Sequence, residues 1–191
     1  MDAKVKVKGG EASAAMPFLS DVKTLRQRAR AHMEEGAVTP GYGADKKAVV
    51  KVLNDALATE IVCVLRYKRH YFMAQGLASD SVKKEFAEHA AEEQVHADRI
   101  AERIVQLGGE PDLNPATLSG RSHSEYVEGK TLVDMIREDL VAERIAIESY
   151  REIIAWLHGK DPTTNRMMRE ILAVEEEHAE DMSSLLAGFE K

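Results

Sequence analysis

A repeated Glu-x-x-His motif constrains the fold of this chain more than any other sequence feature. It occurs at Glu93–His96, with the sequence EQVH, and again at Glu175–His178, with the sequence EEEH. Residues three apart lie on one face of an α-helix, so the glutamate and the histidine of each copy can bind the same metal ion. One copy alone would be weak evidence, because chance produces such pairs in a glutamate-rich chain. The residues around the two copies make the motif informative.

The composition favours a single all-α domain. The 191 residues are 44% hydrophobic and 31% charged, with few aromatic residues and only five prolines, which is typical of long helices. The single cysteine, Cys63, cannot form an internal disulfide, and no signal-like segment opens the chain. No apolar run approaches the roughly 20 residues that span a bilayer. We therefore expect a soluble, cytoplasmic protein without membrane association.

The N-terminal region, residues 1–43, is predicted to be separate from the rest of the chain. Residues 1–19 lack a periodic apolar face and are expected to form a flexible arm. Residues 20–35 are predicted to form a short amphipathic helix with Ser20 as its N-cap. The net charge of the whole chain is −7, but this region carries a surplus of positive charge. DNA is therefore a weak candidate partner for three lysines of the arm, Lys4, Lys6 and Lys8.

Residues 44–191 are predicted to form an antiparallel four-helix bundle. Glycine, proline and capping signals place the helices at residues 45–75, 80–107, 131–159 and 161–188. The first two helices, and likewise the last two, are joined by short turns and should form hairpins. The connection at residues 110–130 contains two prolines and two glycines and is far too long for a hairpin turn. We expect it to cross over along the length of the bundle.

The two predicted hairpins repeat each other around the motif. Glu60 precedes Gly76 by the same distance along the chain as Glu143 precedes Gly159. The two motif glutamates also lie equally far from the starts of their helices, Glu93 from Ser79 and Glu175 from Asp161. Equal distances from an antiparallel turn place residues at the same level of a hairpin. A tyrosine follows each first glutamate at the same spacing, at Tyr67 and Tyr150.

The same-face neighbours of all four glutamates are mostly apolar, so these carboxylates are expected to point into the bundle. Four buried carboxylates without counter-charge would repel each other and take up protons or unfold the bundle. Two divalent cations would remove this cost. One glutamate from each of two helices and a Glu-x-x-His pair from each of the others form a carboxylate-bridged two-metal pattern known in four-helix bundles. Mixed oxygen and nitrogen ligands suit iron or manganese better than structural zinc. The predicted ligands are Glu60, Glu93, His96, Glu143, Glu175 and His178.

Residues 45–188 resemble the bacterioferritins. The segment HADRIAERI at residues 96–104 and the sequence GEPDL at residues 109–113 are similar to the second helix of that family and its exit. The resemblance implies a ferritin-like bundle that oxidises Fe(II) with dioxygen or hydrogen peroxide and stores ferric mineral in a hollow homo-oligomer. It implies that Glu93 and Glu175 lie between the two metals and that Tyr67 supplies an electron. Asp139 is a candidate acceptor for an imidazole N–H near the metals.

The sequence departs from the bacterioferritins at two places. They bind haem through a methionine directly after the first motif glutamate, where this chain has Gln94, so we predict that it binds no haem. The sequence also stops soon after His178, at Lys191, so we do not expect the fifth helix that belongs to their 24-subunit shells. The N-terminal arm and the short C-terminus resemble the smaller, twelve-subunit Dps-like cages. Some of those carry a cysteine pair near the metals, whereas Cys63 has no partner and is interpreted as a small buried residue.

Two other functions remain open at this point. The same ligands would hold two manganese ions in an enzyme with manganese catalase-like or peroxidase activity. A DNA-binding stress-protection protein with a secondary metal site is the second alternative. Three residues just before the first motif, Glu88, His89 and Glu92, are interpreted as a solvated face, with a role in iron passage as the alternative.

Overall fold

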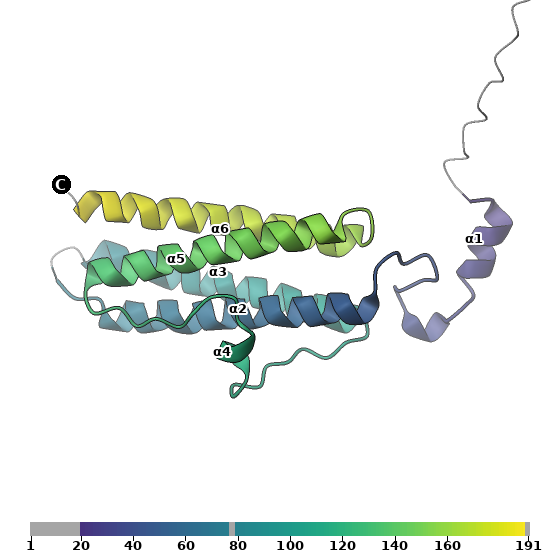
Figure 1. Cartoon of the computed structure of the whole chain (residues 1–191), viewed down its shortest axis with the longest axis horizontal. Helices are drawn as coiled ribbons and strands as arrows, with labels where there is room; N and C mark the ends of the chain where they lie inside the picture. Colours follow the sequence, from purple (N-terminus) through teal and green to yellow (C-terminus); the bar gives the residue numbers. More distant parts are fainter. Residues whose placement is uncertain (1–19, 77–78, 190–191) are drawn as a thin grey trace, which may run out of the picture.

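Four long helices form the bundle in the computed structural model, which describes residues 20–76 and 79–189 (Figure 1). They are α2 (Lys46–Met73), α3 (Ser79–Gln106), α5 (Leu132–Leu157) and α6 (Pro162–Phe189). Most interhelical contacts join α2 to α3 and α5 to α6, so the bundle consists of two antiparallel hairpins. The predicted all-α fold is confirmed. No helix in the described part of the chain is long and apolar enough to cross a membrane.

Local capping explains where these helices begin and end. The Asp45 side chain accepts a hydrogen bond from Lys47 N, at 2.9 Å, and so caps α2. Thr131 and Asp134 form a capping box at the start of α5. Gly108 ends α3 with φ at +74°, a conformation that favours glycine. The boundaries of the bundle helices therefore agree closely with the prediction.

The N-terminal helix is shorter than predicted. Instead of one helix over residues 20–35, the structure has α1 (Val22–Arg28) and a separate 3-10 turn, η1 (Met33–Glu35). Asp21 rather than Ser20 is the N-cap, because its carboxylate accepts hydrogen bonds from both the N–H and the hydroxyl of Thr24. Neither element buries a residue in this chain, so tertiary packing does not extend the helix. The predicted arm at residues 1–19 lies outside the described residues.

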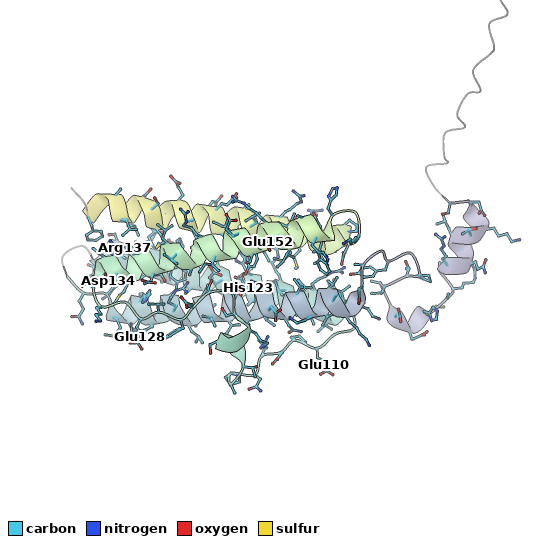
Figure 2. All side chains as sticks on the ribbon, viewed as in Figure 1. Glu110, His123, Glu128, Asp134, Arg137 and Glu152 are labelled. Carbon is cyan, nitrogen blue, oxygen red and sulfur yellow. The ribbon has the colours of Figure 1, made fainter. Side chains whose placement is uncertain are left out.

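The connection between α3 and α5 crosses over along the bundle, as predicted. Figure 2 shows it running from Glu110 near one end, past His123, to Glu128 near the other end. It contains a short helix that the sequence did not predict, α4 (Leu118–Arg121). The buried Leu118 of this helix packs on α2.

Two apolar clusters fill the bundle, one on each side of a belt of buried polar residues. The first includes Leu53, Leu57, Ile100, Ile104, Tyr150, Ile154 and Met168, and the second includes Tyr67, Phe86, Ala90, Met135, Ile136 and Met182. On each of the four long helices, one predicted ligand glutamate lies between the residues of the two clusters. Apolar burial, which contributes about 25 cal/mol per Å² of buried surface, therefore holds the polar belt in place from both sides.

A second group of polar residues, which we call the Asp161 network, is buried apart from the half-buried Tyr42 and joins the end of α3 to the start of α6. It consists of Tyr42, Arg103, Asp161 and Thr164. Arg103 Nη2 lies 3.1 Å from both carboxylate oxygens of Asp161, and Arg103 Nε donates to Thr164 Oγ1 at 2.8 Å. The Asp161 carboxylate also caps α6 through Thr164 N and accepts from the Tyr42 hydroxyl at 2.7 Å. Every charge in this network has a hydrogen-bonded partner.

Candidate metal centre

The structure brings all six predicted ligands together in the polar belt. Ligand atoms of Glu60, Glu93, His96 and Glu175 lie within 4.8 Å of one another. The same holds for Glu93, Glu143, Glu175 and His178. All six side chains are buried. The two groups overlap at Glu93 and Glu175, so these two carboxylates lie between two potential cation positions.

Each hairpin contributes the same parts to the centre. The first supplies Glu60 from α2 and the Glu93/His96 pair from α3. The second supplies the corresponding residues, Glu143 from α5 and Glu175/His178 from α6. Each four-residue group thus takes three residues from one hairpin and one bridging glutamate from the other. The mirrored spacing in the sequence therefore produces a nearly two-fold arrangement in space.

The ligand atoms at the centre lack hydrogen bonds. Among the described residues, eight buried side-chain nitrogen or oxygen atoms have no hydrogen-bond partner, and seven of them belong to these six side chains. His96 Nδ1 lies 3.0 Å from Glu175 Oε1 and His178 Nδ1 lies 3.3 Å from Glu93 Oε1, yet neither contact is a hydrogen bond. Buried polar groups are normally paired, so this concentration of unpaired atoms needs an explanation. Four carboxylates and two neutral imidazoles carry a charge that two divalent cations would cancel, and the donor set fits iron or manganese.

Two tyrosines orient the outer glutamates across the hairpins. Tyr67 of α2 donates a hydrogen bond to Glu143 Oε1, and Tyr150 of α5 donates one to Glu60 Oε1. The second oxygen of each of these carboxylates, Oε2, is unpaired and faces the centre. Each tyrosine therefore fixes one oxygen and leaves the other available as a ligand.

Without bound cations, burial makes it unfavourable for the glutamates of the centre to be ionised. Burial, followed by the charge of Glu93, raises the pKa of Glu60 to about 8. Burial also raises the pKa of Glu143 well above its ordinary value. Burial opposes protonation of His96, but the nearby carboxylates outweigh it and raise the pKa to about 12; for His178 the same balance gives about 11. Without cations, the carboxylates and imidazoles of the centre would therefore take up protons.

Sequence reasoning did not identify the group that orients the ring of His178. Glu92 Oε2 lies 2.8 Å from His178 Nε2, which orients the imidazole so that Nδ1 faces the centre. Asp139 does hold an imidazole, but that of His70 at 2.8 Å, together with Arg66 Nε at 2.8 Å. Asp139 is therefore not the partner of a ligand histidine, because its side chain points to α2 rather than to α3 or α6. The Glu-rich stretch before the first motif gave only a weak signal for Glu92.

Cys63 lies near the centre as a buried thiol. It is buried, and Arg66 Nη2 lies 3.4 Å from its Sγ. Burial raises the pKa of the thiol well above its ordinary value, so the thiolate form is disfavoured. These features agree with the interpretation of Cys63 as a small buried residue.

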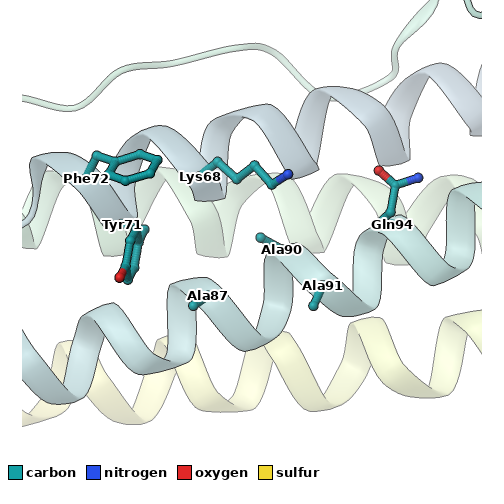
Figure 3. Close-up of a pocket in the computed structure, with 7 residues that line it drawn as sticks. All are labelled: Lys68, Tyr71, Phe72, Ala87, Ala90, Ala91 and Gln94. Atoms are coloured by element: carbon teal, nitrogen blue, oxygen red, sulfur yellow. The ribbon is translucent and has the colours of Figure 1, made fainter.

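Gln94, the residue on which the prediction of no haem depends, faces away from the centre. It lines a surface groove between α2 and α3 together with Lys68, Tyr71, Phe72, Ala87, Ala90 and Ala91 (Figure 3). Its amide donates to Asp98 Oδ1 at 2.9 Å. Neither the amide nor the other lining side chains offer the sulfur ligand of a bacterioferritin haem. The absence of haem stays a prediction.

The fold and the centre together define a ferritin-like protein. The family model described as "Ferritin-like domain" matches residues 50–191, and the chain belongs to this family.

Its relatives are bacterioferritins and Dps proteins. The chain is 30% identical to the DNA protection during starvation protein of Pyrococcus furiosus over 149 residues, which cover 76% of this chain and 80% of the relative. It is 27% identical to the bacterioferritin of Desulfovibrio desulfuricans, covering 72% of this chain and 74% of the relative. Among solved structures, the dodecameric thioferritin of Bacteroides fragilis, a bacterioferritin-related protein, superposes with a TM-score of 0.74. It is 34% identical, and the match covers 77% of this chain and 89% of that one.

Proposed function

We propose that this protein is a ferroxidase that stores or detoxifies iron in a hollow homo-oligomer of twelve subunits and so protects against oxidative stress. The observation that carries the proposal is the pair of overlapping ligand groups, with seven unpaired buried atoms facing each other. The relationship to a dodecameric bacterioferritin-related protein supports the assembly of twelve subunits.

In this proposal Fe(II) is the substrate and the six side chains are its ligands. Glu60 and His96 hold one ion, Glu143 and His178 hold the other, and Glu93 and Glu175 lie between the two. Two Fe(II) ions give up one electron each. Dioxygen takes up both electrons with two protons to form hydrogen peroxide, or hydrogen peroxide takes them up with two protons to form two waters.

The chain's own residues orient the ligands and exclude water. Tyr150 donates a hydrogen bond to one oxygen of Glu60, and Tyr67 donates one to Glu143. Glu92 accepts the N–H of His178. The two apolar clusters keep solvent from the belt, so the carboxylates interact with cations in a low-dielectric environment. Tyr67, which lies against Glu143 at the centre, is additionally proposed as an electron donor when only one Fe(II) is bound. Hydrogen peroxide then takes one electron from that Fe(II) and one from Tyr67, together with the phenolic proton and one proton from solvent, to form two waters and a tyrosyl radical.

Rapid mixing of anaerobic Fe(II)-protein with oxygen or peroxide tests the proposal. We expect Glu93→Ala to slow the initial ferric absorbance change by at least about a hundredfold, because both ion positions lose a ligand. Glu102→Ala, an exposed position on the same helix, is the matched control. An unchanged rate in the Glu93 variant would refute the assignment of the site.

Two further measurements separate the alternatives. Light scattering combined with elemental analysis should give about twelve subunits that hold many more than two irons per chain. A small oligomer with two metals per chain, together with oxygen evolution from peroxide by the manganese-loaded protein, would instead favour a catalase-like enzyme.

A further inference from the structure

An acidic groove lies between α3 and α6, beside the six residues of the centre. Its wall contains Glu85, Glu88, His89, Glu92, Glu177 and Asp181, and it has a volume of about 450 Å³. His178 also lines this acidic groove, so the groove reaches the edge of the dinuclear centre. Within the groove, the described residues offer five carboxylates and no lysine or arginine.

His89 is buried at the floor of the acidic groove, which contradicts its interpretation as part of a solvated face. Only 2% of the residue is exposed, and its ring stacks on that of His178 with a centroid distance of 4.0 Å. The orientation of α3 that points Glu93 into the bundle also places His89, one turn earlier, under the edge of α6. The sequence could not show this, because the crossing of two helices decides which residues at the edge become covered.

The hydrogen bond from Tyr67 fixes which nitrogen of His89 carries the proton. When Glu143 is ionised, as a cation ligand is, the Tyr67 hydroxyl donates to it and the hydroxyl oxygen accepts from His89 Nδ1, at 3.2 Å. Nδ1 of His89 therefore carries the hydrogen. In the neutral ring Nε2 then presents a lone pair.

That lone pair faces two carboxylates. His89 Nε2 lies 3.5 Å from Asp181 Oδ2 and 3.9 Å from Glu85 Oε2, beyond the usual range of a hydrogen bond. All three atoms lie within 4.8 Å of one another. Three facing acceptors are mutually repulsive unless a cation lies among them. One imidazole nitrogen and two carboxylate oxygens form a donor set that first-row divalent cations accept.

The two-fold relation between the hairpins provides an internal comparison. Glu85 and His89 lie two turns and one turn before Glu93, and the residues at the same places before Glu175 are Met167 and Ile171. The residue that corresponds to Asp181, at the same spacing after Glu93, is Arg99. The other side of the bundle therefore has no such donor set. The cluster is not a by-product of the repeat that forms the dinuclear centre.

We propose that Glu85, His89 and Asp181 form a third divalent-cation site in the acidic groove, next to the dinuclear centre. Water completes the coordination, because Asp181 is exposed. The site takes Fe(II) in the working protein, a part of the inference that rests on the proposed function. Cation binding itself does not depend on iron oxidation.

Anaerobic titration with Co(II), which is not oxidised under these conditions, tests the site in the full-length assembly. We expect Asp181→Asn and Glu85→Gln each to bind one equivalent per chain fewer than the wild type, or to bind it at least tenfold more weakly. Glu180→Gln on α6 and Glu102→Gln on α3 are matched controls outside the groove and should behave like the wild type. Equal stoichiometry and affinity in all four variants would overturn the proposal.

Anomalous diffraction from Co(II)-soaked crystals then locates the ion. A peak among the side chains of Glu85, His89 and Asp181 supports the site, and its absence there overturns it. Glu93→Ala separates the two proposals, because it should remove the two central ions and leave the third. If that variant kept all its ions while Asp181→Asn lost one, the dinuclear assignment would fail and the third site would stand.

Discussion

The candidate metal centre and the Asp161 network are both largely buried polar groups in one bundle, but their charges are balanced in opposite ways. In the Asp161 network one carboxylate meets one guanidinium, two hydroxyls and a backbone N–H. In the centre four carboxylates meet two imidazoles, and seven ligand atoms have no hydrogen bond. A buried polar group that is complete within the protein holds helices together. One that is incomplete indicates a site for something from outside.

Removing one partner from each group is the strongest test of this difference. Asp161→Ala should lower the free energy of unfolding of the metal-free protein by about 3–5 kcal/mol, because it leaves the Arg103 charge buried and unpaired. Glu93→Gln should lower it by less than Asp161→Ala does, because three carboxylates of the centre still face the two imidazoles. Urea unfolding at fixed protein concentration measures both variants.

Glu102→Ala, at an exposed position, serves as the control and should lie within about 0.5 kcal/mol of the wild type. A loss from Glu93→Gln as large as that from Asp161→Ala would contradict the contrast between the two groups.

The pH dependence of stability should have opposite signs for the two groups. The pKa of Asp161 is lowered, because its hydrogen bonds to Thr164, Tyr42 and Arg103 outweigh burial, so its contribution is present above about pH 3.8 and is lost as the pH falls through the folded pKa. The pKa of Glu60 is raised from 4.5 to about 8, so its contribution is present below about pH 4.5 and is lost as the pH rises through 8.

Denaturation of the metal-free wild type and of Glu60→Gln between pH 4 and 9 isolates the second effect. The wild type should lose stability relative to the variant as the pH rises through this range. Parallel curves would show that Glu60 does not hold a proton in the folded protein.

The smallest expected effects distinguish the two tyrosines of the centre. Tyr67→Phe and Tyr150→Phe should each cost about 1 kcal/mol of stability, because each removes one buried hydrogen bond to a carboxylate. Only Tyr67→Phe should also remove the hydrogen bond that holds the His89 ring. We therefore expect this variant to slow Fe(II) oxidation more than Tyr150→Phe does. Stopped-flow oxidation rates for the two variants, compared at equal iron loading, check this order. Equal slowing would mean that the tyrosines act only by orienting Glu60 and Glu143.

Much of the fold and of the centre's geometry followed from distances along the chain. Equal spacing from the turns placed Glu60 level with Glu93 and Glu143 level with Glu175, because an α-helix has a fixed rise per residue. The pairing of Tyr67 with Glu143 and of Tyr150 with Glu60 could not be predicted, since it depends on how one hairpin packs on the other. The same is true of Glu92 against His178 and of the burial of His89. The length of α1 was overestimated because its apolar face has no packing partner within the described part of the chain.

The tyrosine of each hairpin donates a hydrogen bond to a glutamate of the other hairpin, and this symmetry bears on the ancestry of the molecule. A single α2–α3 hairpin placed against a copy of itself would supply the same six ligands and the same two crossed hydrogen bonds. Such a repeat is what an internal gene duplication produces, and the long connection through α4 turns a dimer of hairpins into one chain. The two halves are not identical, however: His89 lies beside Tyr67 on one side, whereas Ile171 belongs to the apolar cluster around Tyr150 on the other. The two half-sites therefore differ in character, with an imidazole at the tyrosine of one and an aliphatic side chain in the apolar cluster of the other.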